Sequence, residues 1–136
     1  MRLIPFLLAS AVSFTSAGTN WTFERQGLTA ILSDPAIDAS PLRLSCAQRG
    51  YLEISILAGS KAEVTLVGPS NIRLTLRGEL TPEGRLTSNV FFRSLTVEFL
   101  AQEGDIEVLG GRSYKLHLDG ARRVLRTLES SCMAVA

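Results

Sequence analysis

The feature that most constrains the fold of this chain is a series of short runs in which apolar and polar side chains alternate. In LRLSC (42–46), for example, Leu42, Leu44 and Cys46 share one face. Comparable runs, several separated by Gly-, Pro- or Asn-containing turns, occupy residues 21–25, 28–32, 51–57, 62–67, 72–77, 106–109 and 113–118. Alternation with a period of two is typical of antiparallel strands that bury one face and expose the other.

Chain length and composition limit this pattern to one globular domain. The 136 residues accommodate a single core, and 46% of them are hydrophobic against 20% charged. We therefore expect a mainly β fold of the α+β type, either an antiparallel β-sandwich or a barrel-like sheet, in one β-rich domain over residues 18–136. The formal net charge of +1 argues against nucleic acid as a partner.

The N-terminal segment MRLIPFLLASAVSFTSA has the layout of a secretory signal peptide. Arg2 precedes an apolar run, and small residues end it at Ala17, where we expect cleavage. The apolar run is too short to span a bilayer. The alternative is a buried N-terminal helix or strand. We therefore expect residues 1–17 to be removed and the protein to be periplasmic or secreted, with no membrane span after cleavage.

Export gives a meaning to the two cysteines, Cys46 and Cys132. In an oxidising compartment, an even pair in a small chain is most simply a disulfide. A loop of about 85 residues would contribute roughly 4.5 kcal/mol on the loop-entropy model. A reactive cysteine or a metal site are the alternatives, and the single histidine, His117, gives a metal site little support. We expect no metal and no other cofactor.

The segment LDGARRVLRTLESSC (118–132) predicts a C-terminal helix packed on the sheet. Asp119 is a suitable N-cap, because its carboxylate can accept first-turn amides. One apolar stripe then comprises Ala121, Val124, Leu125 and Leu128. Cys132 follows Ala121 by eleven residues, which places the two about 20° apart around the helix axis. The cysteine therefore faces the sheet, where Cys46 shares the apolar face of its strand.

Residues 94–102 are compatible with either a helix or a strand. Leu95 and Phe99 have helical spacing, but Leu95, Val97 and Phe99 also alternate. We favour a short helix with Gly104 as its C-terminal cap, although the β-branched Val97 weakens this interpretation.

Arg122, Arg123 and Arg126 lie opposite the apolar stripe of the predicted C-terminal helix. A solvated helix face is the simplest interpretation. However, cations in the first helical turn oppose the helix dipole by about 0.3–1 kcal/mol each. These three residues are therefore the candidate binding residues of the chain, for an anionic partner.

Catalytic constellations are weak in this sequence. Ser113, His117 and Asp119 share one face of a predicted strand, but positions i and i+4 of a strand lie about 13 Å apart. That distance prevents the hydrogen bond that a catalytic serine needs from its base. We interpret His117 as a surface residue and expect no catalytic residues.

The segment YKLHLDGARRVLRTLESSC (114–132) resembles the closing segments of invasion-associated locus B-like proteins and type VI secretion accessory proteins of Gram-negative bacteria. In these, a strand leads into glycine and a small residue, then a helical apolar pattern and a final cysteine. The matching positions are Tyr114, Leu118, Gly120, Ala121, Leu125, Leu128 and Cys132. The resemblance implies an exported β-rich domain with a structural disulfide, and it assigns no catalytic residue.

Two function classes follow from these features. The first is a non-enzymatic exported binding or accessory domain that contacts another envelope protein or an anionic envelope component. The second is an inhibitor of a hydrolase, or less favoured a hydrolase itself. For inhibition, DPAIDASP (34–41) is expected to be a proline-stiffened loop, since rigidity lowers the entropic cost of binding.

Overall fold

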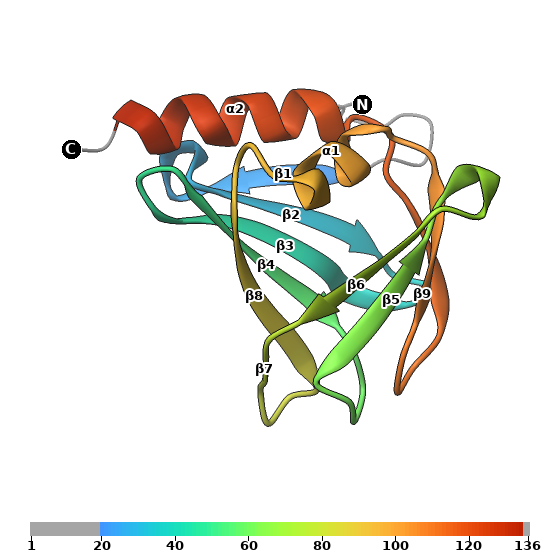
Figure 1. Cartoon of the computed structure of the whole chain (residues 1–136). Helices are drawn as coiled ribbons and strands as arrows, with labels where there is room; N and C mark the ends of the chain where they lie inside the picture. The colour runs from blue at the N-terminus through green and yellow to red at the C-terminus, as the bar shows by residue number, and fades with distance from the viewer. Residues whose placement is uncertain (1–19, 135–136) are drawn as a thin grey trace, which may run out of the picture.

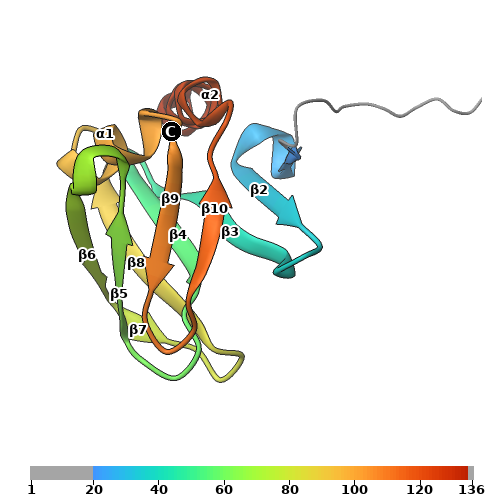
Figure 2. The same ribbon diagram turned by 90° about the vertical axis from the view of Figure 1, so that its right-hand side faces the viewer.

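The strands form two antiparallel sheets that face each other (Figures 1 and 2). The computed structural model describes residues 20–134. The first sheet has six strands in the order β1-β2-β3-β4-β8-β7. Their bounds are β1 Trp21–Glu24, β2 Thr29–Asp34, β3 Asp38–Gln48, β4 Tyr51–Leu57, β8 Arg85–Phe91 and β7 Glu79–Leu80. A single turn of 3-10 helix, η2 (Arg25–Gly27), joins β1 to β2.

The second sheet has four strands in the order β10-β9-β5-β6. Their bounds are β10 Tyr114–His117, β9 Asp105–Leu109, β5 Glu63–Val67 and β6 Arg73–Arg77, with the 3-10 turn η3 (Pro69–Asn71) between β5 and β6. Side chains from both sheets fill the core, among them Leu42, Leu44, Leu52, Ile54, Ile56, Val64, Leu66, Leu86, Val108 and Leu116. Each is at most 1% exposed, as close packing between two apolar sheet faces requires.

Gly78 carries the chain from one sheet to the other, between β6 and β7. A Cβ at this position would lie 1.9 Å from the carbonyl oxygen of Thr87 on β8. No residue with a side chain fits there without moving the backbone. The close approach allows the chain to turn the corner and pair β7 with β8.

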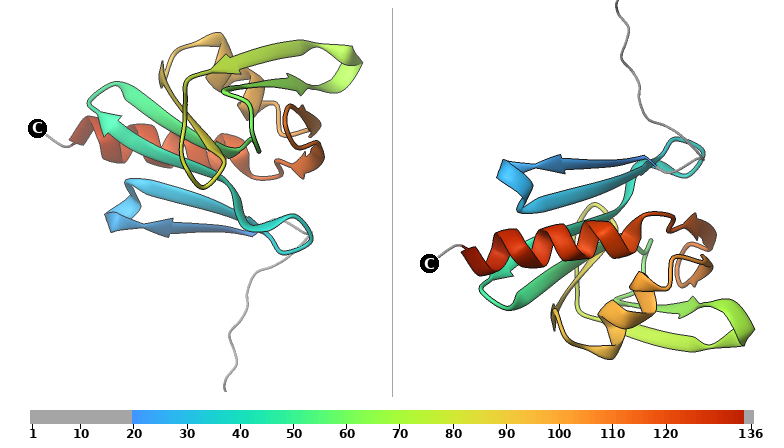
Figure 3. Two further views of the ribbon diagram at one scale, coloured as in Figure 1. Left: turned by 90° about the horizontal axis from the view of Figure 1, so that it is seen from below. Right: turned by 90° about the horizontal axis from the view of Figure 1, so that it is seen from above.

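Two helices cover one end of the sheets (Figures 1 and 3). The short α1 (Leu95–Ala101) begins at Ser94, whose hydroxyl accepts a hydrogen bond from the Val97 backbone N–H at 3.3 Å. The longer α2 (Ala121–Ala134) lies across that end against α1, β2 and β3. Its buried residues close this end of the core.

The predicted fold class is confirmed. The protein is mainly β, with antiparallel sheets, a C-terminal helix and one disulfide, and the sheets do not close into a barrel. The preference for a helix over 94–102 is also confirmed by α1. The predicted signal peptide, residues 1–17, lies outside the described residues.

The expected loop at residues 34–41 is wrong. β2 extends to Asp34 and β3 begins at Asp38, with Asp34 and Asp38 paired, so residues 35–37 alone form the turn. Pro41 lies within β3 at a point before the β3–β4 ladder begins at Leu42. A proline is tolerated here because its missing N–H interrupts no bond to β4.

The predicted C-terminal cap of α1 is also displaced by one residue. Glu103, not Gly104, adopts the left-handed conformation after the helix, with φ of +66°. This conformation is unfavourable for a residue with a side chain. The Glu103 side chain accepts a hydrogen bond from the first turn of α2, and this contact accounts for its place.

Candidate functional site

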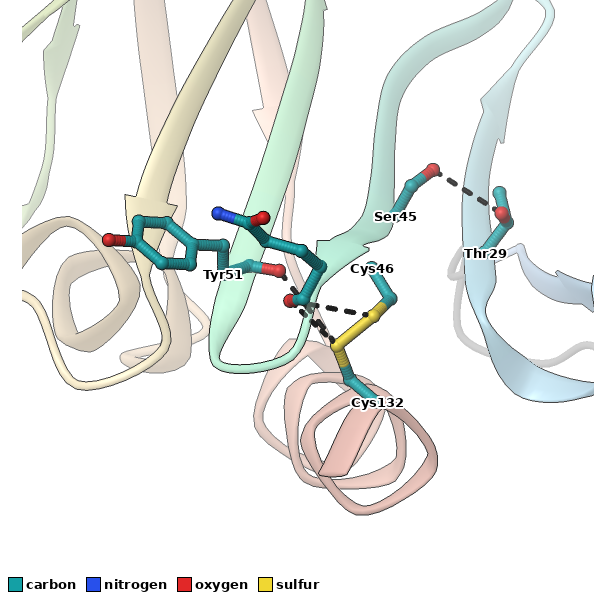
Figure 4. The surroundings of a disulfide bond; sticks show 6 residues. Thr29, Ser45, Cys46, Tyr51 and Cys132 are labelled. Carbon is teal, nitrogen blue, oxygen red and sulfur yellow. Dashed lines mark hydrogen bonds between the residues drawn. A yellow bond between two sulfur atoms is a disulfide. The ribbon is translucent and has the colours of Figure 1, made fainter. Parts of the chain in front are cut away.

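The Cys46–Cys132 disulfide joins α2 to β3, as predicted (Figure 4). The two Cα atoms are 5.5 Å apart, and Cys132 is completely buried. The predicted apolar stripe is buried as well, with exposed fractions of at most 4% for Ala121, Val124, Leu125 and Leu128. Beside the disulfide, the Ser45 hydroxyl donates to the Thr29 hydroxyl at 3.3 Å and links β3 to β2. The face of α2 opposite the stripe is therefore held in a fixed orientation.

The prediction that Asp119 is the N-cap of α2 is wrong. The helix begins at Ala121, and its first backbone bond runs from Val124 N–H to the Gly120 carbonyl, so Gly120 occupies the cap position. A carboxylate from outside the helix replaces the missing cap. The Glu103 Oε2 atom accepts the Arg122 backbone N–H at 3.0 Å.

The three candidate binding residues on α2 do not form one uniform ridge. All three are exposed. Arg122 is fastened to α1, because its Nε donates to the Ala101 carbonyl at 3.2 Å. Arg122 and Arg126 line a hollow between α1 and α2, whereas Arg123 does not line it. The structure therefore brings two of the predicted residues into one site.

This hollow has an apolar floor and a charged rim. Its volume is about 390 Å³. The lining residues are Phe92, Val97, Glu98, Ala101, Gln102, Arg122, Leu125, Arg126 and Glu129. A second hollow, of about 360 Å³, is lined by Gly50, Phe91, Phe92, Arg93, Ser94, Glu129 and Met133. Both hollows share Phe92 and Glu129, and we call them together the helical groove.

Three large apolar side chains stand exposed on β8, α1 and α2, and two of them, Phe91 and Met133, line this groove. Phe91, on β8, is 58% exposed, Leu95 78% and Met133 46%. Phe91 also packs against Tyr51, with ring centroids 4.5 Å apart. Gathered exposed apolar side chains mark interaction surfaces more often than scattered ones do.

The helical groove was not predicted from the sequence, although one local pattern indicates part of it. Adjacent residues of a strand point to opposite faces of a sheet. In the dipeptide Phe91-Phe92, the strand pattern therefore predicts one aromatic ring on the outside and the other in the core. Phe92, which directly follows β8, is the buried one. The approach of α1 to α2, which forms the groove walls, has no such local signal.

His117 is exposed and pairs with Asp105 on β9. Its Nδ1 lies 2.8 Å from Asp105 Oδ1, and the side chains are 51% and 63% exposed. This hydrogen bond raises the pKa of His117 above its ordinary value, with Asp34 and Asp119 adding smaller contributions through their charge. The partner of His117 is thus a carboxylate of the neighbouring strand, and Ser113 lies before β10 begins.

Two further features of residues 20–134 concern metal binding and membrane spanning. Within this range, His, Cys, Asp and Glu side chains form no group of three that could hold a metal ion. No helix among them has the length and hydropathy needed to cross a bilayer.

Comparisons of the chain with protein-family models, with curated proteins and with solved structures gave no significant match.

Proposed function

We propose that this protein is an exported, non-enzymatic binding domain of the bacterial envelope, and that the helical groove binds a segment of a partner protein. The observation that carries the proposal is the exposure of Phe91 and Met133 in the lining of this groove, with the exposed Leu95 directly after the lining residue Ser94. Complete burial of a fully exposed side chain of this size would gain about 1.5–3 kcal/mol, and these three, which are 46–78% exposed, would gain a corresponding part of it. A partner that covers the groove would gain part of this free energy.

The chemistry of the rim defines the partner segment. At the end formed by α1 and the first half of α2, the exposed Arg122 and Arg126 line the hollow with one exposed carboxylate, Glu98. At the other end, Arg93 and Glu129 approach to 3.8 Å and neutralise each other beside Met133. We therefore expect a segment with a large apolar side chain for the Phe91–Met133 end and a carboxylate for the Arg126 end.

Export is supported by the disulfide and by the resemblance of residues 114–132 to small exported proteins. A buried disulfide that joins β3 to the last helix is compatible with an oxidising compartment. Periplasmic and secreted locations are equally consistent with it. The resemblance supports an envelope role in a Gram-negative host.

Inhibition of a hydrolase by a projecting 34–41 loop is less well supported. Only residues 35–37 connect β2 to β3, and the Asp34 and Asp38 side chains accept hydrogen bonds from Ala36 N–H and Ser40 N–H. The segment is too short to enter an enzyme cleft as an extended loop.

Selection from a random peptide library displayed on phage tests the proposal. We expect the oxidised domain to enrich peptides that combine a large apolar residue with Asp or Glu. The amide chemical-shift changes on binding should map to α1, α2 and the end of β8. Phe91→Ser and Met133→Ser should each weaken binding about tenfold, the effect of losing about 1.4 kcal/mol.

Phe23→Ser is the matched control. Phe23 is 44% exposed on β1, in the same sheet as Phe91, and does not line the groove. This variant should bind the selected peptides as the wild type does. The proposal is wrong if no peptides are enriched, or if Phe91→Ser leaves their affinity unchanged.

A further inference from the structure

Three arginine side chains converge on residues 37–40, at the start of β3. Arg85 Nη1 donates to the Ser40 carbonyl at 2.7 Å, and Arg43 donates from Nε and Nη2 to the Ser40 hydroxyl at 3.3 and 3.2 Å. Arg112, from the turn between β9 and β10, donates from Nη2 to the Ile37 carbonyl at 2.7 Å. Two guanidinium groups thus contact one residue, and a third contacts the same short segment.

Unpaired backbone explains part of this arrangement. The β3–β4 ladder begins at the pair Leu42–Ile56, so β4 offers no partner to the Ser40 carbonyl. Arg85 supplies the missing donor, and its Nε and Nη2 also bind the hydroxyl and the carbonyl of Ser55, at 2.8 and 3.1 Å. A buried backbone carbonyl without a hydrogen-bond donor is costly. The hydrogen bonds of Arg85 to Ser40 and Ser55, which we call the arginine clamp, therefore stabilise the sheet.

The clamp leaves an excess of positive charge. In the described part of the chain, none of the three guanidinium groups comes within 4.0 Å of a carboxylate oxygen. Arg85 is half-buried, and its pKa is lowered by burial and, next, by the charge of Arg43, while Asp38 opposes this effect. Asp38 is thus the carboxylate whose charge acts on Arg85, and it does not form an ion pair with it.

Tyr114 adds no negative charge to the cluster. Its hydroxyl donates to the Leu57 carbonyl at 2.5 Å, and burial raises its pKa, so the phenol stays neutral. The three arginines therefore donate to uncharged carbonyl and hydroxyl oxygens, which do not balance the positive charge of the guanidinium groups. Arginines also have unused donors, since a guanidinium group carries five N–H bonds and Arg85 uses three of them here.

We propose that Arg43, Arg85 and Arg112 bind an oxyanion, a phosphate or carboxylate group carried by an envelope molecule or free in solution. Guanidinium groups match the geometry of both oxyanions and keep their charge at any physiological pH. The bound anion would lie over the Ser40 region and would offset the repulsion between Arg43 and Arg85. This site shares no residue with the helical groove, so it does not depend on the function proposed above.

Nuclear magnetic resonance titration of the oxidised protein with inorganic phosphate, and separately with acetate, tests the proposal at constant ionic strength. We expect saturable shifts of the Ile37 and Ser40 amides and of the Arg43 and Arg112 Nε–H groups. A saturable response to phosphate alone assigns the site to phosphate, free or carried by a larger molecule, and a response to acetate alone assigns it to a carboxylate.

Variants separate anion binding from a purely structural clamp. Arg43 and Arg112 are exposed, so Arg43→Gln and Arg112→Gln should fold and should each weaken the binding of the anion about tenfold. Asp38→Asn keeps an acceptor for Ser40 N–H and should strengthen binding. Arg77→Gln, which removes an exposed arginine paired with Glu63 at 2.9 Å, should have no effect.

The proposal is overturned if the shifts increase linearly without saturation, or if Arg43→Gln and Arg112→Gln respond as Arg77→Gln does. A structural clamp alone would lower the unfolding free energy of the first two variants and leave no saturable anion response in the wild type.

Discussion

The Glu103 carboxylate caps α2 by accepting the backbone N–H of Arg122 at 3.0 Å. Glu103 follows α1 and lies 19 residues before its partner in sequence. A negative charge at the first turn also complements the helix dipole there and offsets the unfavourable position of Arg122 and Arg123. The side chain of Arg122 completes the connection by donating to the Ala101 carbonyl. The two walls of the helical groove are therefore fixed to each other at the end where α2 begins.

Removing the Glu103 carboxylate should destabilise the protein more than removing the Asp119 carboxylate, which lies next to the start of α2. We expect Glu103→Ala to lower the free energy of unfolding by about 1 kcal/mol, the usual value for a lost cap. Asp119→Ala should have a smaller effect, because Asp119 does not occupy the cap position. Urea denaturation of both variants measures the difference. An equal loss for both would contradict the assignment of Glu103 as the cap.

Reduction of the disulfide should release α2 before the sheets. The bridge spans 86 residues, and on the loop-entropy model its loss costs up to about 4.5 kcal/mol. Hydrogen exchange followed by mass spectrometry should show faster exchange in α2 than in β4 once the protein is reduced. The oxidised protein is the control. Simultaneous loss of protection in both elements would show that the bridge holds the whole fold rather than the helix.

Asp105→Asn should lower the pKa of His117 toward about 6.5, its ordinary value. The pKa of His117 is higher in the folded state, so the interaction stabilises the protein below about pH 6.5 and is lost as the pH rises through the folded-state pKa. Because both side chains are about half exposed, we expect less than about 1 kcal/mol. His117 is the single histidine of the chain, so its carbon-bound ring protons report the titration without overlap. An unchanged pKa in the variant would exclude Asp105 as the cause.

Gly78→Ala should be among the most destabilising small substitutions in the protein. Its Cβ would lie 1.9 Å from the Thr87 carbonyl oxygen, which belongs to the backbone of a central strand and cannot swing away. We expect a loss of about 3 kcal/mol or more. Gly50→Ala is a control for backbone strain alone, since Gly50 has φ of +87° and no atom within 4 Å of the added Cβ. Thermal unfolding of the two variants should separate the effects, and a similar cost for both would contradict the close-packing argument.

The strands and the packing of α2 on the sheets were predictable because the sequence patterns that indicate them are local. Alternation with a period of two places Leu42 and Leu44 in the core, and the 3.6-residue period does the same for Val124 and Leu128. The start of β3 was not predictable from composition. The two aspartates and two prolines of residues 34–41 indicate a loop. In the structure, Asp38 pairs with Asp34, and the long-range contact of Arg85 with Ser40 holds the segment in place.

The sequence by itself determined the fold class, the helix on the sheets and the pairing of Cys46 with Cys132. The fold class and the helix depend on the periodicity of apolar residues within short segments. The pairing follows because the chain has two cysteines. Only the tertiary structure decided how Glu103 caps α2, where α1 meets α2 beside Phe91, and which arginines gather at Ser40. Apart from the contact of Arg43 with Ser40, three residues away, these contacts join residues that are far apart in sequence. No local pattern indicates which distant groups come within hydrogen-bonding distance when two sheets and two helices pack together.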